Sequence, residues 1–116
     1  MIDWSIQKAR DTYNIAHWSG GYFDINARGH LVCRPDGRAE HPGIDMFELS
    51  REIKAAGLSL PVLVRFSDIL RHRVETLCSA FDHAMQADNY RGHYTAVYPI
   101  KVNQQKSVVE KILARN

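Results

Sequence analysis

Lys101 is the residue of this 116-residue chain whose position most strongly indicates chemistry. It lies near the carboxyl end of an apolar run, Tyr94–Val102, whose pattern predicts a buried strand. Side chains alternate along a strand, so one face would carry Lys101 together with Val97, Pro99 and Asn103. Apolar surroundings favour the neutral form of a lysine amine. A neutral amine is a nucleophile that can form an imine with an aldehyde, most notably pyridoxal phosphate.

A structural role for Lys101 is the alternative on position alone, because a single strand lysine usually lies at a sheet edge or extends its amine into solvent. Pro99 favours this alternative, since proline removes a ladder donor and is typical of an edge or of a strand's start. We interpret three further polar residues as satisfied or solvated side chains, because an isolated polar residue is a weak signal: Arg65, His72 and Tyr98.

The elements that would position Lys101 alternate between helix and strand. Apolar residues at helical spacing over 46–56 predict a helix, with Asp45 as its cap and Gly57 at its end. The predicted order continues with a strand over 60–66, a helix over 67–85 with Ser67 as its N-cap, a loop over 88–92, the strand over 94–102, and a third helix that contains Val108, Val109, Ile112 and Leu113. Apolar strands separated by helices predict a parallel sheet. Two strands do not make a stable sheet of that kind, so the pattern predicts the opening of a larger α/β fold.

A different pattern precedes these elements. A short helix is expected within residues 1–13. Residues 22–33 predict a β-hairpin, with a turn at Asn26–Gly29. Residues 34–43 hold a Pro-Asp-Gly turn and no apolar periodicity, so we interpret them as a linker.

Composition and length bound the class of protein. Hydrophobic residues make up 45% and charged residues 24% of the chain, which predicts a folded domain. Fifteen basic and thirteen acidic residues are interspersed and give a net charge of +2, so neither a nucleic-acid partner nor a membrane partner is expected. A complete α/β barrel needs at least about 200 residues, which excludes one in this chain alone.

The cysteines and histidines predict no metal site. Cys33 and Cys78 stand alone in the sequence, as reduced thiols of a cytoplasmic protein would. The six histidines belong to no metal-binding motif. The first residues do not resemble a secretory signal, and no apolar run approaches the roughly 20 residues that a membrane helix needs.

The segment Tyr98–Gln104 closely resembles the cofactor-lysine motif of the biosynthetic arginine decarboxylases of bacteria and plants. The resemblance extends in order from about residue 12 to residue 114. It includes the blocks Tyr13–Trp18, Gly21–Asn26, Gly29–His30, Leu60–Phe66 and Ile69–Arg73.

This resemblance implies a fold and an activity. Residues 44–116 would be the opening portion of a pyridoxal-phosphate-binding (β/α)8 barrel, incomplete here, and residues 1–43 would carry the hairpin of a β-domain. Lys101 would hold pyridoxal 5'-phosphate as a Schiff base, and Asn103 would lie beside the cofactor. The family converts L-arginine to agmatine and carbon dioxide for polyamine synthesis. Its members are cytoplasmic homo-oligomers, with Mg²⁺ as a second cofactor.

The chain departs from the family in length. Family members have several hundred residues, and their pyridinium partner, phosphate loop and substrate contacts lie downstream. We therefore expect an N-terminal fragment that is inactive alone. Two alternatives remain: a truncated, non-catalytic domain that acts as an interaction module, and a small α/β protein that folds alone and uses Lys101 structurally.

Overall fold

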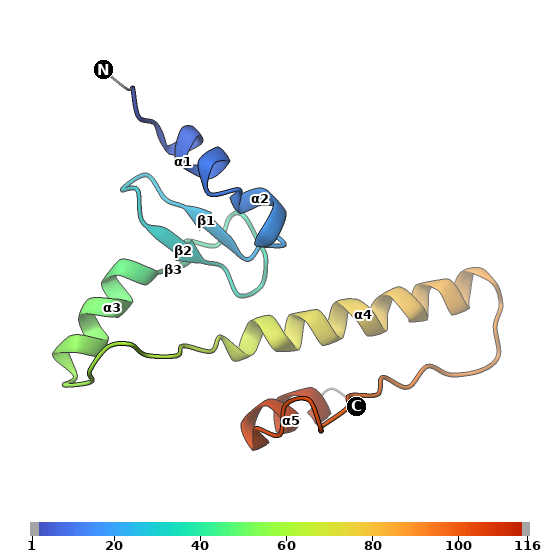
Figure 1. The fold of residues 1–116 in the computed structure, drawn as a ribbon. Helices are drawn as coiled ribbons and strands as arrows, with labels where there is room; N and C mark the ends of the chain where they lie inside the picture. Colours follow the sequence, from blue (N-terminus) through green and yellow to red (C-terminus); the bar gives the residue numbers. More distant parts are fainter. Residues whose placement is uncertain (1–2, 115–116) are drawn as a thin grey trace. The chain divides into compact units, whose positions relative to one another are not determined.

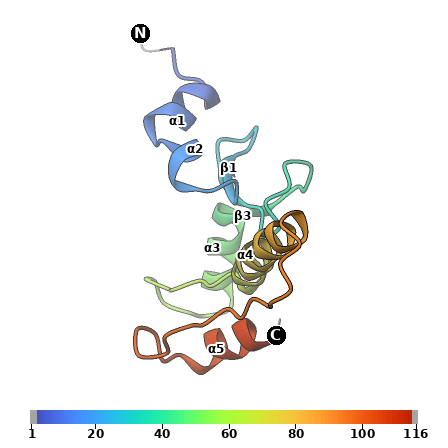
Figure 2. The ribbon, with the colours of Figure 1, turned by 90° about the vertical axis from the view of Figure 1, so that its right-hand side faces the viewer.

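The computed structural model describes residues 3–114. The chain divides after Arg65 into two compact units, the second of which begins at Phe66. Each unit is built from neighbouring segments of the chain (Figures 1 and 2).

A three-stranded antiparallel sheet forms the centre of the first unit. Its strands are β1 (Phe23–Ile25), β2 (Leu31–Cys33) and β3 (Ile44–Asp45), with β2 in the middle. The predicted hairpin is confirmed, because β1 and β2 pair with Phe23 opposite Cys33. Its turn is also where the sequence places it: the Gly29 N–H donates to the Asn26 carbonyl at 2.9 Å, and Gly29 takes the positive φ (78°) that glycine tolerates. β3 was not predicted and lies just after the segment that we interpreted as a linker.

Two short helices cover part of this sheet. Helix α1 (Ile6–Thr12) confirms the predicted N-terminal helix; residues 1 and 2 of the predicted range lie outside the described residues. The Ser5 hydroxyl caps α1 by accepting the Lys8 N–H at 3.1 Å. Helix α2 (Ile15–Trp18) was not predicted. The two helices and β1 share a core made of Ala9, Ile15 and Ile25, against which Ile6 and Leu31 pack.

Helix α3 (Met46–Ala55) follows β3 directly and confirms a prediction in detail. The Asp45 carboxylate accepts the backbone N–H groups of Phe47 and Glu48, as the predicted cap requires. Gly57 follows the helix with φ 84°, as a helix-ending glycine does. Because α3 contacts β2, the helix belongs to the same compact unit as the sheet. The predicted boundary between residues 43 and 44 concerns the domains of the larger protein, and it stays a prediction.

The second unit contains two helices, α4 (Ser67–Ala87) and α5 (Lys106–Leu113). Both were predicted, and α5 packs against α4 with Val108 and Ile112 buried. The prediction of Ser67 as N-cap is wrong by one residue: Phe66 occupies the cap and Ser67 is the first helical residue. After the loop that follows α4, the ring of Tyr94 stacks on Phe81 of α4, with centroids 3.9 Å apart. This contact holds the returning chain against the helix.

Both predicted apolar strands, 60–66 and 94–102, are wrong as strands within residues 3–114. Each runs largely as extended chain without a strand partner, and Ile100–Val102 form a turn (Figure 1). The physical reason is that a strand needs a neighbour to complete its hydrogen-bonded ladder, and these parallel-sheet patterns have no such partner in the described part of the chain. The period-two pattern itself persists, since Tyr94, Ala96 and Tyr98 are half-buried while Val97 is exposed. The chain is α/β, as predicted, but its sheet is the antiparallel β1–β2–β3 sheet. The predicted parallel sheet is absent from residues 3–114, and the barrel stays a prediction.

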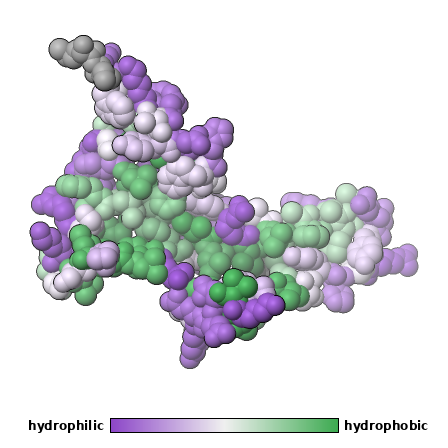
Figure 3. Space-filling model, in the orientation of Figure 1, coloured by the Kyte–Doolittle hydropathy of each residue, from purple (hydrophilic) through white to green (hydrophobic). Residues whose placement is uncertain are grey.

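The isolated 116-residue chain should melt over a broad range or self-associate. Large apolar side chains lie at its surface (Figure 3), among them Leu63, Val97 and Val102 with 77%, 88% and 76% of their areas exposed. Exposed apolar patches of this kind drive association, and an incomplete core lowers cooperativity. Circular dichroism melts combined with analytical ultracentrifugation test this expectation. A sharp two-state transition from a monomer would contradict it.

Candidate functional site

Lys101 lies on a tight turn between an extended apolar segment and α5. The turn is closed by the Val102 N–H, which donates to the Pro99 carbonyl at 3.1 Å. Lys101 is the third residue of this turn, and its side chain is exposed. The predicted placement of Lys101 on a buried strand is therefore wrong for the described residues. The turn interrupts the extended backbone, and no neighbouring strand within residues 3–114 covers the lysine. The amine is accessible instead.

Apolar side chains accompany Lys101 on both sides. Val97, Ile100 and Val102 all rank among the exposed large hydrophobic residues. The predicted strand face is retained up to Pro99, which is exposed like Val97, and it ends where the turn begins. The surroundings of Lys101 therefore have the apolar character that the sequence predicts, without the enclosure.

Asn103 is half-buried two residues beyond Lys101. Its side-chain oxygen Oδ1 accepts the backbone N–H of Gln105 at 3.1 Å. Gln105 is in turn the N-cap residue of α5, so the Asn103 side chain lies at the entrance of that helix. The structure thus gives Asn103 a backbone partner, which the sequence analysis did not foresee. An asparagine that bonds to the backbone two residues on is a recognised turn pattern, and this pattern could have found it.

The three weaker candidates lie on different elements. Arg65 is exposed at the end of the first unit. His72 is half-buried within α4, where its carbonyl accepts the Thr76 hydroxyl at 2.8 Å. Tyr98 is half-buried just before the turn Pro99–Val102, which we call the lysine turn.

A carboxylate shared by two arginines is the best-organised polar cluster of the first unit. Asp24 on β1 accepts from Arg10 Nε at 2.7 Å and from an Arg34 guanidinium nitrogen at 3.1 Å. Burial by itself raises the pKa of Asp24, but hydrogen bonds from Arg10, from the Ile25 N–H and from Arg34 hold that pKa below its usual value. The cluster joins α1, β1 and the segment after β2. Its role is therefore structural. The local sequence pattern does not predict this cluster, because its three residues are far apart in the chain.

Asp45 is the centre of a second polar cluster, which includes Asn26 and His30 of the hairpin. Besides capping α3, its carboxylate accepts from Asn26 Nδ2 at 3.0 Å and pairs with His30 Nδ1 at 2.8 Å. Burial raises the pKa of Asp45, but the hydrogen bonds from His30, the Glu48 N–H and Asn26 outweigh that effect and lower it to about 2. The sequence predicts the cap alone. The side-chain partners come from residues 15 and 19 positions away, a separation that the local pattern does not encode.

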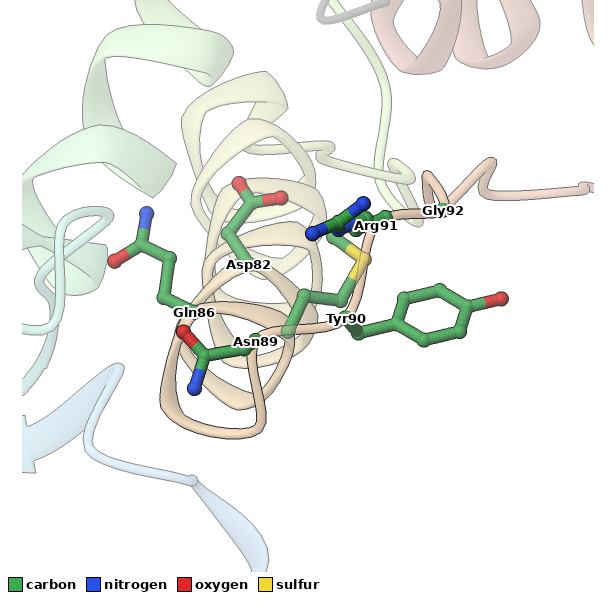
Figure 4. Close-up of a pocket in the computed structure, with 7 residues that line it drawn as sticks. Asp82, Gln86, Asn89, Tyr90, Arg91 and Gly92 are labelled. Carbon is green, nitrogen blue, oxygen red and sulfur yellow. The ribbon is translucent and has the colours of Figure 1, made fainter.

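A shallow, open pocket lies where α4 ends (Figure 4). Its lining contains none of the predicted site residues and consists of Asp82, Met85, Gln86, Asn89, Tyr90, Arg91 and Gly92. A Cβ atom added at Gly92 would come within 2.3 Å of the Tyr90 ring, so a larger residue there would require the Tyr90 side chain to shift.

Within residues 3–114 we find no group of three or more His, Cys, Asp and Glu side chains that could hold a metal ion. Cys33 and Cys78 are free thiols, as predicted, and burial raises the pKa of Cys33. The helices of the described residues are too short or too polar to cross a membrane.

Fold and site together define the class: an α/β chain that presents an accessible lysine between an extended apolar segment and a helix. Its relatives are decarboxylases. The biosynthetic arginine decarboxylase of Alkalilimnicola ehrlichii is 55% identical over 113 residues, which is 97% of this chain and 18% of the relative. Those of Shewanella frigidimarina and Chromobacterium violaceum are each 50% identical over 98% and 96% of the chain, again 18% of their own length. A comparison with protein-family models finds no match.

The resemblance predicted from the motifs is therefore confirmed. Over nearly its whole length, the chain is homologous to a segment of the biosynthetic arginine decarboxylases. The chain spans only 18% of the length of these curated relatives.

Proposed function

We propose that this chain supplies the cofactor lysine, Lys101, to a pyridoxal-phosphate-dependent decarboxylase that converts L-arginine to agmatine and carbon dioxide. The observation that carries the proposal is the 55% identity with a biosynthetic arginine decarboxylase. That match covers 113 of 116 residues, so it spans the segment that contains Lys101. The accessible amine on the lysine turn adds support, because attachment of an aldehyde requires a reachable amine.

The residues around Lys101 fit such a cofactor. Val97, Ile100 and Val102 present exposed apolar surface close in sequence to the amine, which suits an aromatic ring. Lys101 would hold pyridoxal phosphate through Nζ. When bound, this cofactor supplies an electron sink for the electron pair that the departing carboxylate leaves at the substrate α-carbon.

The chain's own contribution is to deliver and orient Nζ of Lys101. Nζ must be unprotonated to act as a nucleophile. Once replaced by the substrate amine, Nζ would be free to carry a proton near the reacting carbon. Contacts to the substrate guanidinium, to the cofactor phosphate and to Mg²⁺ would come from parts of the larger protein outside this chain. We further propose that this protein is a cytoplasmic homo-oligomer that serves polyamine synthesis.

An assay of carbon dioxide release from carboxyl-labelled L-arginine tests the proposed activity. The full-length protein that contains this segment should release labelled carbon dioxide from L-arginine faster than from L-ornithine or L-lysine. Removing pyridoxal phosphate should stop the release, and restoring it should recover the rate. A protein that leaves arginine intact and decarboxylates another amino acid would contradict the proposed substrate.

An interaction module is the second candidate, and the exposed apolar side chains favour it. Leu63 and Val97 offer surface that a partner could cover. This alternative predicts that Lys101 is dispensable for the protein's function, which separates it from the decarboxylase proposal.

A further inference from the structure

We propose that Asn103 is a positioning residue for Lys101. It closes the turn that leads into α5 and thereby fixes the backbone that carries the lysine. This inference rests on the proposed function and assigns to Asn103 a role other than contact with the cofactor.

The hydrogen bond from the Gln105 N–H to Asn103 Oδ1, 3.1 Å long, is the first observation. Gln105 is the N-cap residue of α5, yet its own side chain makes no capping bond. The first N–H groups of a helix need acceptors from outside the helix. The Asn103 oxygen satisfies the N–H of the cap residue itself, and this contact fixes the backbone that leads into the helix.

Helix α5 is a firm anchor for this turn. Its Val108 and Ile112 are among the few buried apolar residues of the chain, and the helix packs against α4. Gln105 is therefore held by the helix, and Asn103 is held by Gln105. On the other side of Lys101, the bond from the Val102 N–H to the Pro99 carbonyl closes the preceding turn. Lys101 thus lies within one hydrogen-bonded turn, Pro99–Val102, and is followed directly by a second, Asn103–Gln105, which depends on a side chain.

The two ends of the Asn103 amide distinguish positioning from cofactor contact. The turn uses the acceptor Oδ1, whereas an additional contact to an anionic or acceptor group of a cofactor would use the donor Nδ2. Aspartate keeps an acceptor and removes the donor, and its charge is favourable ahead of a helix N-terminus. Alanine removes both groups. If Asn103 acts through the turn alone, only Asn103→Ala should impair the protein. If Asn103 contacts the cofactor through Nδ2, both substitutions should impair it.

The experiment uses the full-length protein with Asn103→Asp, Asn103→Ala and, as a matched control, Gln104→Ala at an exposed neighbouring position. The first readout is hydrogen exchange of the Gln105 amide. The second is the rate at which Lys101 in the cofactor-free protein is labelled by pyridoxal phosphate and borohydride, followed by peptide mass spectrometry. The third is the separation of kcat from KM for arginine.

Asn103→Ala should accelerate exchange of the Gln105 amide about fivefold, as loss of one modest hydrogen bond allows. It should slow labelling of Lys101 and lower kcat about tenfold with little change in KM, because a misplaced reacting group impairs the chemical step. Asn103→Asp and Gln104→Ala should stay within about twofold of the unchanged protein in all three readouts.

Two results would overturn the inference. Equal damage by Asn103→Asp and Asn103→Ala would assign the effect to the lost donor and hence to a cofactor contact. Normal labelling and normal Gln105 exchange in Asn103→Ala would show that the turn does not need the side chain. Failure of the proposed function gives a different result. The unchanged protein would then take no label at Lys101, but the Gln105 amide would still exchange faster in Asn103→Ala than in the other variants. That result would overturn the catalytic purpose of the turn together with the proposed function.

Discussion

If the proposed function holds, replacing Lys101 with alanine in the full-length protein should remove the absorbance band of added pyridoxal phosphate and lower kcat for arginine at least about a thousandfold, which corresponds to about 4 kcal/mol of transition-state stabilisation. The reason is that alanine offers no amine to hold the aldehyde and none to carry a proton near the reacting carbon. Absorbance spectra and the carbon dioxide assay measure both effects. Survival of the band and of the activity in Lys101→Ala would contradict the assignment.

Two further substitutions separate the amine from the positive charge. Lys101→Arg keeps the charge, but a guanidinium is not deprotonated in proteins, so this variant should be as inactive as Lys101→Ala. Lys106→Ala is the matched control. Lys106 is an exposed lysine in the first turn of α5, 3.6 Å from Glu110, and its loss should change kcat less than about twofold.

Replacing Asp24 with asparagine should lower the local free energy of unfolding of the first unit by about 2 kcal/mol at neutral pH. The change removes the charge that two arginines share and leaves Arg10 and Arg34 close together without their common partner. Native-state hydrogen exchange of peptides that cover β1 and β2 should accelerate about thirtyfold, the equivalent of that free energy. Asp11→Asn is the control, because Asp11 is an exposed carboxylate of α1 and its loss should alter exchange only slightly.

The effect of Asp24→Asn should depend on pH in a fixed direction. The folded protein holds the pKa of Asp24 below its usual value, so the folded state binds the proton less readily than the unfolded chain does. The stabilisation is therefore complete above the unfolded pKa of about 4 and is lost as the pH falls through the lower, folded pKa. Exchange rates of the two proteins should converge in acid. A difference that does not shrink below about pH 4 would contradict a role for the Asp24 charge.

Local patterns predicted much of the fold because the interactions behind them are local. The Asn26–Gly29 turn, the Asp45 cap and Gly57 after α3 all depend on residues within four positions of one another. The segments 60–66 and 94–102 show the limit of this approach. Their composition is that of strands, but a strand exists only where a second segment completes its ladder, and that condition lies outside the segment's own sequence.

The same distinction applies to the polar sites. The motif around Lys101 directed attention to the accessible lysine turn, and its neighbours Val97 and Val102 are apolar as expected. The cluster on Asp24 was missed because its arginines lie 14 and 10 positions away along the chain. Asn103 was assigned to the cofactor from its place on the predicted strand face. The turn that replaces the end of that strand gives its oxygen a backbone partner, and the contact with the cofactor stays a prediction.

Borohydride reduction of the full-length protein after incubation with pyridoxal phosphate tests the central claim most directly. Reduction fixes the cofactor permanently to the lysine that holds it, and peptide mass spectrometry then identifies that lysine. We expect the label on Lys101, with Lys106 and Lys111 of α5 unlabelled. A label on another lysine, or no label from a protein that decarboxylates arginine, would contradict the account.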